Sequence, residues 1–409
     1  MKMRHAAIAT ALALALGACD SSTSSTCTAS CSETGTTNVQ SLQTWAASGR
    51  DLSLAGDTNL ASTAAPFSQA LRDRWDSVVN LKKYSALVDS DLSRILRDWA
   101  SRTPTATGWT VVRTTDTAMP ISGTLQLVRF SVDGIQQGGL VWIPNTSVSH
   151  PVILVGHPGD GGVDDQTANL FGLLVGASTL GGGSVNLDKV ILVFPAYRGE
   201  TAYLGADSVE SDVSTISPWD RDVDDGLAML QAVLDRTPNA DASRISAIGF
   251  SRGAGVSLIT ALRDKRIKSV FDIAGPTDFF APSIQQVSFM IAAGQPIDLP
   301  GVNYLGARYV GPFWKGNMSA DSIRTALLRR SVARLAGSHL LPTTEAVQGL
   351  SDSTVFPEHM RHLALADSRV DTVPVPGMTH TSWMSYTNSV QLFKVGSELQ
   401  AFLKTNLGI

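Results

Sequence analysis

The stretch RISAIGFSRGAGVSL, residues 244–258, decides the fold. Its first half is an apolar run that is typical of a strand buried on both faces. From Gly253 onward the pattern predicts a helix. Between the two lies GFSRG (249–253), which matches G-x-S-x-G. A serine on such a tight strand-to-helix turn needs small neighbours on either side, and Gly249 and Gly253 supply them. The alternative is a Gly-rich turn without chemistry.

Buried strands and amphipathic helices alternate around this stretch. The runs PVILVGHPGDGG (151–162) and KVILVFPAYRGE (189–200) each join a buried strand to a polar loop. A core-facing helix is predicted by apolar side chains at helical spacing, at Val223, Leu227, Leu230 and Leu234. Further strands are expected at 110–115, 125–132, 137–143, 270–273 and 344–348, and further helices at 165–179 and 253–262. The alternation predicts an α/β fold with a doubly wound, mostly parallel sheet.

Two other segments do not follow this alternation. Residues 277–340 are rich in Phe, Tyr and Trp, and we interpret them as a cap-like helical insertion that shapes an apolar site. The alternative is a set of packing helices away from any site. Residues 39–104 carry apolar side chains at helical spacing and predict a small helical N-terminal layer. The domain that carries the chemistry is then expected at 105–409.

Ser251 is the candidate nucleophile, and a hydroxyl needs a general base to attack. Four histidines follow it in the chain. His380 lies in a loop between a strand-like segment and the last amphipathic helix, so it is the predicted base. His339 precedes the last strands. His359 and His362 fall in a predicted helix, where we expect them at the surface.

The acid that orients the base is expected between Ser251 and His380. Asp352 follows the predicted strand 344–348 in a turn, and the 28 residues from there to His380 leave room for one helix and one strand. Its carboxylate would fix the histidine tautomer and stabilise the imidazolium. The competing carboxylates are Asp278, which we interpret as a turn residue, Asp367 and Asp371.

A tetrahedral intermediate also requires hydrogen-bond donors for its oxyanion. The backbone N–H of Arg252, directly after the nucleophile, is the first candidate. The second is expected in the loop 156–162 after the earlier strand. Pro158 has no N–H, which leaves His157 or Gly159.

These pieces resemble the α/β-hydrolase superfamily, and most of all its dienelactone hydrolase and prolyl-oligopeptidase-like branch. The resemblance spans 105–409 and rests on HPGDGG, FPAYRGE, GFSRGAG, IAGPTDF, GLSDSTVFPEHM and GMTH. It implies the α/β-hydrolase fold and hydrolysis through an acyl-enzyme on Ser251.

Two departures from that branch favour a carboxylic ester as the substrate. Its post-proline peptidases typically carry a large propeller, and the segment 39–104 is too short to build one. They also use a tyrosine as an oxyanion donor, and the loop 156–162 contains none. A peptidase or amidase with the same triad is the first alternative. A non-catalytic surface-binding lipoprotein is the second.

The run of aspartates at 220–225 resembles the start of an EF-hand calcium loop. The sixth position is Asp225 where that loop needs Gly, and the twelfth is Gln231 where it needs Glu. The helical stripe beginning at Val223 instead favours a helix N-terminus that acidic side chains stabilise. We therefore expect neither a metal nor another cofactor.

Composition limits the partners of this 409-residue chain. Apolar residues make up 43% and charged residues only 17%, which excludes a mostly disordered protein. The formal net charge is −4, with no basic stripe, so nucleic acid is not an expected partner. The three cysteines exclude a disulfide scaffold. The oligomeric state is left open.

The N-terminus predicts export. Residues 1–18 have a basic start and an apolar stretch too short to span a bilayer, as in a secretory signal peptide. Leu16 to Cys19 reads LGAC and resembles a bacterial lipobox, which implies lipidation of Cys19 and anchorage to a membrane of the cell envelope. Residues 19–38 form a Ser/Thr-rich tether. In an oxidising compartment its Cys27 and Cys31 can pair or stay free.

Overall fold

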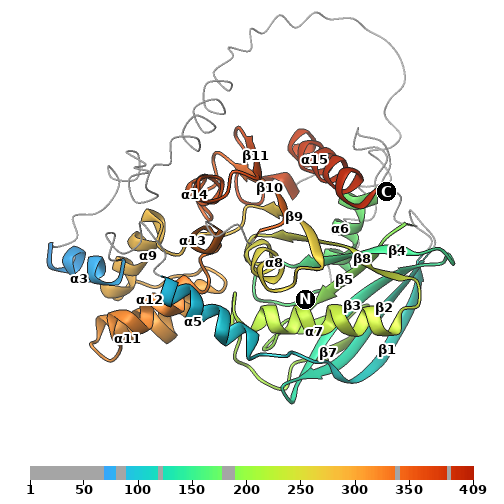
Figure 1. Ribbon diagram of the computed structural model, residues 1–409, viewed down its shortest axis with the longest axis horizontal. Helices are drawn as coiled ribbons and strands as arrows, with labels where there is room; N and C mark the ends of the chain where they lie inside the picture. Colours follow the sequence, from blue (N-terminus) through green and yellow to red (C-terminus); the bar gives the residue numbers. More distant parts are fainter. Residues whose placement is uncertain (1–68, 80–88, 118–122, 177–188, 337–340, 385–387) are drawn as a thin grey trace, which may run out of the picture. The chain divides into compact units, whose positions relative to one another are not determined.

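A computed structural model describes residues 69–79, 89–117, 123–176, 189–336, 341–384 and 388–409 (Figure 1). All of these belong to one compact unit, Val39–Ile409. The predicted signal peptide, the lipidated Cys19, the tether with Cys27 and Cys31, and the first part of the helical layer lie outside the described residues and stay predictions.

Nine strands form one sheet in the order β1-β2-β3-β5-β4-β8-β9-β10-β11. Their bounds are β1 Thr107–Thr117, β2 Gly123–Val132, β3 Ile135–Pro144, β4 His150–Gly156, β5 Ile191–Pro195, β8 Ala240–Phe250, β9 Ile267–Ile273, β10 Thr343–Gly349 and β11 Val370–Val375. Each of the pairs β5–β4, β4–β8, β8–β9, β9–β10 and β10–β11 is parallel. The strands β1, β2 and β3 add an antiparallel edge, in which β3 pairs with β5. The doubly wound, mostly parallel sheet is therefore confirmed, in the arrangement of the α/β-hydrolase fold.

Helices cover both faces of this sheet (Figure 1). Side chains of β4 alternate between the two faces, as a strand requires: Val152 and Leu154 join one buried cluster and Ile153 and Val155 the other. The first cluster contains side chains from α7 (Arg221–Arg236), α8 (Arg252–Arg263) and α14 (Glu358–Ala366). The second contains side chains from α6 (Asp165–Gly176) and α15 (Ser389–Leu407).

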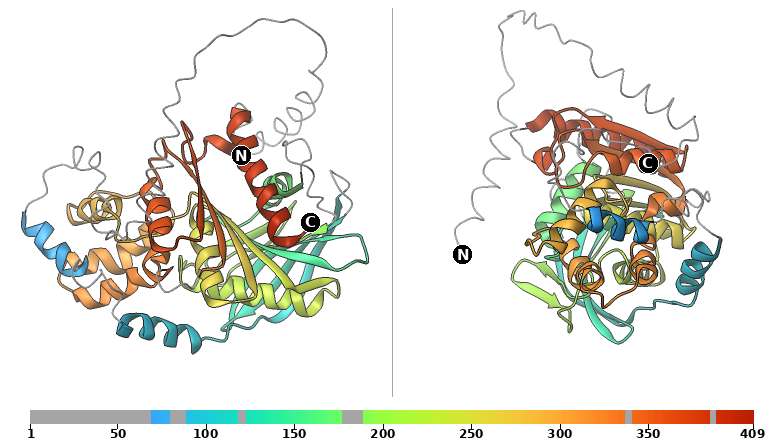
Figure 2. Two further views of the ribbon diagram at one scale, coloured as in Figure 1. Left: turned by 45° about the horizontal axis from the view of Figure 1, so that its top comes forward. Right: turned by 90° about the vertical axis from the view of Figure 1, so that its left-hand side faces the viewer.

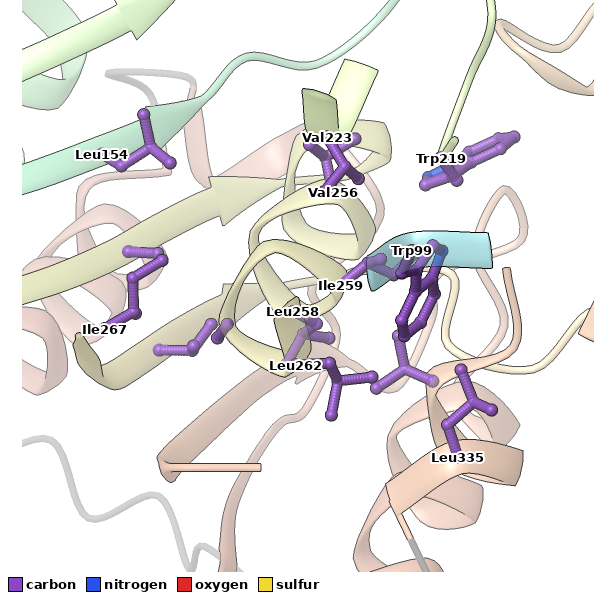
Figure 3. Close-up of a cluster of buried hydrophobic side chains, with 14 of the residues drawn as sticks. Trp99, Leu154, Trp219, Val223, Val256, Leu258, Ile259, Leu262, Ile267 and Leu335 are labelled. Atoms are coloured by element: carbon purple, nitrogen blue, oxygen red, sulfur yellow. The ribbon is translucent and has the colours of Figure 1, made fainter. Parts of the chain in front are cut away.

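The N-terminal layer contains α3 (Gln69–Val79) and α5 (Asp89–Ala100). Figure 3 shows Trp99 of α5 beside Ile259 and Leu262 of α8, so α5 packs on the sheet domain. Trp75 of α3 is buried and stacks on Trp314 with ring centroids 6.1 Å apart, so α3 packs on the insertion (Figure 2).

The insertion contains short helices. They are α9 (Pro282–Ala292), α10 (Val302–Leu305), the π-helical turn η4 (Gly306–Val310), α11 (Gly311–Trp314), α12 (Ala320–Leu328) and α13 (Val332–Ala336). Phe289 and Phe313 are buried, and Phe289 packs against Trp314 at 6.1 Å. These aromatic side chains face the insertion's own core and α3, which is the packing role that we set out as the alternative. That the insertion shapes a substrate site stays a prediction.

One element was missed by the sequence analysis. A hairpin of β6 (Thr201–Leu204) and β7 (Asp207–Glu210) follows β5, where only a polar loop was expected. Its strands are four residues each, too short to show a convincing alternation. Within the described part of the chain, no helix is both long and apolar enough to cross a membrane.

Candidate active site

Ser251 occupies the turn between β8 and α8 in a strained backbone conformation, with φ 55° and ψ −125°. This conformation is costly for a residue with a Cβ and is typical of functional sites. A Cβ on Gly249 would lie 2.3 Å from the carbonyl oxygen of Gly253, and one on Gly253 would lie 2.2 Å from the backbone of Gly156. The two flanking glycines are therefore required by close backbone approach, as the G-x-S-x-G pattern predicts.

The structure brings Ser251, His380 and Asp352 together. His380 Nε2 lies 2.8 Å from Ser251 Oγ, and His380 Nδ1 lies 2.8 Å from Asp352 Oδ2. These are hydrogen-bond distances at both ring nitrogens. The serine reaches the histidine from the end of β8, and the other two side chains come from the loops after β10 and β11.

Asp352 is 3% exposed and its oxygens are fully engaged. Its Oδ1 accepts hydrogen bonds from the backbone N–H groups of Thr354 (2.8 Å) and Val355 (3.0 Å). Its Oδ2 accepts from Gln348 Nε2 (3.1 Å) besides facing His380. The carboxylate is thus oriented before any substrate binds.

His380 sits at the edge of the site. Its side chain is 13% exposed, and its ring lies 5.0 Å from the ring of Phe250, the residue before the nucleophile. Ser251 is also half-buried. Ser251 and His380 are therefore both accessible from solvent, while the Asp352 side chain is buried.

Arg252 follows the nucleophile, and its guanidinium is buried in a charged network. Its Nη2 donates to Asp222 Oδ2 at 2.8 Å, and its Nη1 pairs with Glu200 and donates to the carbonyl of Gly159 at 2.8 Å. Since Arg252 is the first residue of α8, its backbone N–H has no acceptor within the helix. That N–H is directed outward at the positive end of the helix dipole.

His157 begins the loop after β4 and is completely buried. Its Nε2 lies 3.1 Å from Glu200 Oε2, and its ring stacks on Tyr197 with centroids 4.5 Å apart. Its side chain thus contacts Glu200 and Tyr197 in the buried charged network around Arg252. Gly159, the other candidate donor, has φ +74° and gives its carbonyl to Arg252.

Burial and charge act in opposite directions within this network. Burial alone would raise the pKa of the Glu200 carboxyl, but His157 and Arg252 outweigh it and hold that pKa below its usual value. Burial raises the pKa of Asp222 to about 7, against the influence of Arg252. Glu200 is therefore the firmly ionised partner of Arg252 at neutral pH.

The aspartates in the run 220–225 each bind an arginine. Asp220 accepts from Arg102, Asp224 from Arg263 and Asp225 from Arg198, all within 2.6 Å, besides the pair of Asp222 with Arg252. The helix does begin at Arg221, with Asp222 and Asp224 in its first turn. Across the described residues, no group of His, Cys, Asp and Glu could hold a metal ion.

Asp278, His359 and His362 form a second buried cluster. His362 Nδ1 lies 2.8 Å from Asp278 Oδ2, which also pairs with Arg334 at 2.8 Å. His359 Nδ1 accepts from the backbone N–H groups of Thr277 and Asp278 at 3.2 Å. The expectation that both histidines lie at the surface was therefore wrong, because both side chains are buried and each has a polar partner at Nδ1.

None of the competing carboxylates faces His380 in this way. Asp278 does accept from the backbone of Phe280 (3.0 Å), as a turn residue would, but its carboxylate is also paired with Arg334 and His362. Asp367 is bonded to Arg369, and Asp371 lies exposed on β11. His339 lies outside the described residues.

No protein-family model matches the chain, and no curated protein matches it. Among solved structures it is similar to acetyl xylan esterase 1 from Thermoanaerobacterium sp. JW/SL YS485, with 17% identity over 75% of this chain and 92% of that chain, and a TM-score of 0.48. It is similar to the alpha/beta hydrolase GrgF from Penicillium sp. sh18, with 16% identity over 70% of this chain and 99% of that chain, at TM-score 0.48. It is also similar to an acylaminoacyl peptidase from Pyrococcus horikoshii, with 13% identity over 71% of this chain and 42% of that chain, at TM-score 0.48. Such low identities and TM-scores carry no argument about the reaction.

Proposed function

We propose that this chain is a serine hydrolase that cleaves a carboxylic ester through an acyl-enzyme on Ser251. The observation that carries the proposal is the placement of His380, with one ring nitrogen 2.8 Å from Ser251 Oγ and the other 2.8 Å from Asp352. A nucleophile, a base within hydrogen-bond reach and a buried group that orients the base are the parts that acyl transfer needs.

The steps follow from these positions. Ser251 Oγ attacks the ester carbonyl while His380 Nε2 takes the hydroxyl proton, and Asp352 stabilises the imidazolium. The tetrahedral intermediate collapses, the bond to the alkoxide breaks, and His380 gives the proton to the departing alcohol. A water molecule then attacks the acyl-enzyme, again with His380 as base, and releases the carboxylic acid and free Ser251.

Negative charge that develops on the carbonyl oxygen needs donors that are already in place. The backbone N–H of Arg252 is the first proposed donor, since it lies at the start of α8 beside Ser251. His157 or Gly159 supplies the second, from the loop after β4. This loop approaches the elbow closely, because a Cβ on Gly253 would lie 2.6 Å from the carbonyl oxygen of His157.

An ester is the proposed substrate class rather than a peptide. No tyrosine lies in the loop 156–162, and the described part of the segment 39–104 before the sheet consists of the helices α3 and α5. Both features differ from the post-proline peptidases of the branch that the sequence resembles, and they support an ester rather than a peptide as the substrate. A peptidase or amidase with the same triad is the competing proposal.

The test compares leaving groups in one enzyme. We expect p-nitrophenyl esters to be hydrolysed with a higher kcat/KM than aminoacyl anilides, and Ser251→Ala to lower kcat by about 10⁵–10⁶-fold. Ser397→Ala on α15 is the matched control and should retain full activity.

Faster turnover of anilides would contradict the ester assignment while leaving the triad intact. Failure of a fluorophosphonate probe to label Ser251 in the folded protein would contradict catalysis itself. It would instead favour a non-catalytic binding protein on this scaffold.

A further inference from the structure

Glu200 joins the two segments that carry the candidate oxyanion donors. Its side chain is fully buried, with one carboxylate oxygen paired to Arg252 and the other 3.1 Å from His157 Nε2. We propose that Glu200 is a positioning residue that fixes the geometry of the oxyanion hole. This inference rests on the proposed function, since it concerns the same reaction.

The Arg252 side of this connection is held at its guanidinium and at its backbone carbonyl. Asp222 accepts from both Nε (3.0 Å) and Nη2 (2.8 Å), and Trp219 Nε1 donates to the backbone carbonyl of Arg252 at 3.0 Å. With Glu200 on Nη1, the guanidinium cannot turn about its long axis. Together with the hydrogen bond from Trp219 to the backbone carbonyl, these contacts restrain the turn that carries the Arg252 backbone N–H.

The loop after β4 is bound to the Glu200 segment at its far end as well. Val163 N donates to the carbonyl of Thr201 at 3.1 Å, and Tyr203 N donates to the carbonyl of Val163 at 2.9 Å. Since Thr201 directly follows Glu200, a displacement of Glu200 would also displace this end of the loop. At the near end, His157 contacts Glu200 through its side chain.

The charges explain why a carboxylate is suited to this position. Glu200 stays ionised because Arg252 and His157 lower its pKa despite its burial. His157 Nε2 and Glu200 Oε2 are at ion-pair distance without the alignment of a hydrogen bond, and Arg252 also lies over the face of Tyr197 at 5.2 Å. An uncharged amide at position 200 would keep the shape but weaken its attraction for both partners.

The experiment compares Glu200→Gln with Glu210→Gln, a matched change at an exposed glutamate of the β6–β7 hairpin. Active sites are titrated with a fluorophosphonate, so that kcat is expressed per reactive Ser251. We expect Glu200→Gln to lower this kcat by about 10²-fold and to change KM by less than about 3-fold. The affinity for a boronic acid, which forms an anionic tetrahedral adduct on the serine, should fall by about the same 10²-fold. Glu200→Asp should recover part of both losses.

If Glu200 has a purely structural role, Glu200→Gln lowers the melting temperature or the titrated fraction. It then leaves kcat per titrated site and the affinity for the boronic acid at their wild-type values, and this result would overturn the proposal. If Glu200→Gln does not fold, His157→Asn removes one of the two contacts and should lower kcat per site by about 10-fold. Wild-type kcat in that variant would equally overturn it. A wild-type protein that neither reacts with the probe nor hydrolyses esters would instead show that the proposed function fails.

Discussion

Buried charged side chains hold the loops after β4, β5 and β8, whereas backbone N–H groups and one amide hold the loop after β10. On the nucleophile side, Arg252 is surrounded by Glu200, Asp222 and the carbonyl of Gly159. On the acid–base side, Asp352 is bonded to the backbone of Thr354 and Val355.

The difference follows from what each side has to do in the proposed reaction. Donors for an oxyanion must stay fixed while charge appears in front of them, and a network of charged groups resists displacement. The base must take up and release a proton, so its neighbours have to accommodate both charge states. His380 accordingly packs on Phe250 and keeps a partly exposed ring, and Asp352 is its one carboxylate partner among the described residues.

Among the variants that test this comparison, the one with the largest expected effect changes the carboxylate that orients His380 and leaves its backbone contacts in place. In Asp352→Asn, Oδ1 can still accept from the backbone, but the amide replaces the oxygen that faces His380 Nδ1. The histidine is then held in the wrong tautomer, and we expect kcat to fall by about 10³–10⁴-fold with little change in melting temperature. Asp371→Asn, at an exposed position of β11, is the control. A large drop in the melting temperature of Asp352→Asn would mean that the loop after β10 also depends on a buried charge for its stability.

A smaller effect is expected from a single methyl group on the nucleophile side. In Gly253→Ala the new Cβ would lie 2.2 Å from the backbone of Gly156, so the start of α8 has to move away from the loop after β4. A shift of this kind typically costs about 10²-fold in rate, measured as kcat/KM. Gly161→Ala, in the same loop with no atom within 4 Å of the new Cβ, should be unchanged. Equal activity of the two variants would show that the elbow tolerates displacement.

The smallest effect concerns the pH dependence of stability at the second buried cluster, where His359 contacts Thr277 and Asp278. Burial lowers the pKa of His359 from 6.5 to about 4, and His362 adds to this while Asp278 opposes it. Below pH 6.5 the unfolded chain takes up a proton that the folded chain refuses until about pH 4, so this group makes stability fall as pH drops through that window. His359→Asn keeps an acceptor near Nδ1 and removes the titration. Its free energy of unfolding, from denaturant titrations between pH 7 and pH 4.5, should fall less steeply than that of the wild type, by at most about 1.4 kcal/mol per pH unit. If the free energy of unfolding falls equally steeply with pH in His359→Asn and in the wild type, His359 is not the group that titrates in this range.

Most of the sheet could be predicted because its strands are unbroken apolar runs joined to helices with clear periodicity. The run 151–156 has no polar residue, and the run 245–250 before Ser251 has only Ser246. The placement of Ser251, Asp352 and His380 in one site also followed from chain order, since each comes directly after a strand of a parallel sheet. Their chemical roles remain proposals that the variants above test.

The charged network could not be predicted, because it depends on long side chains that meet across segments far apart in the sequence. Glu200 lies in the loop after β5, Asp222 in the first turn of α7 and Arg252 at the start of α8, and no spacing rule joins them. The same reason explains the error at His359 and His362. Their helix has an ordinary amphipathic pattern, but Asp278 and Arg334 meet it from the insertion side. An unusual run of aspartates at 220–225 was the available signal, which the sequence analysis interpreted as a helix N-terminus; the structure pairs these carboxylates with arginines.

The packing of α3 on the insertion has a consequence for how the chain is made. Arg74 and its partner Trp314 are separated by 240 residues, so the apolar face of Trp75 emerges long before the helices that bury it. At a synthesis rate of about 5–20 residues per second, that interval is roughly 10–50 s. During this time the first helix exposes a large aromatic surface of the kind that chaperones bind. The contacts of α3 with the insertion therefore cannot form before the helices of the insertion have been synthesised.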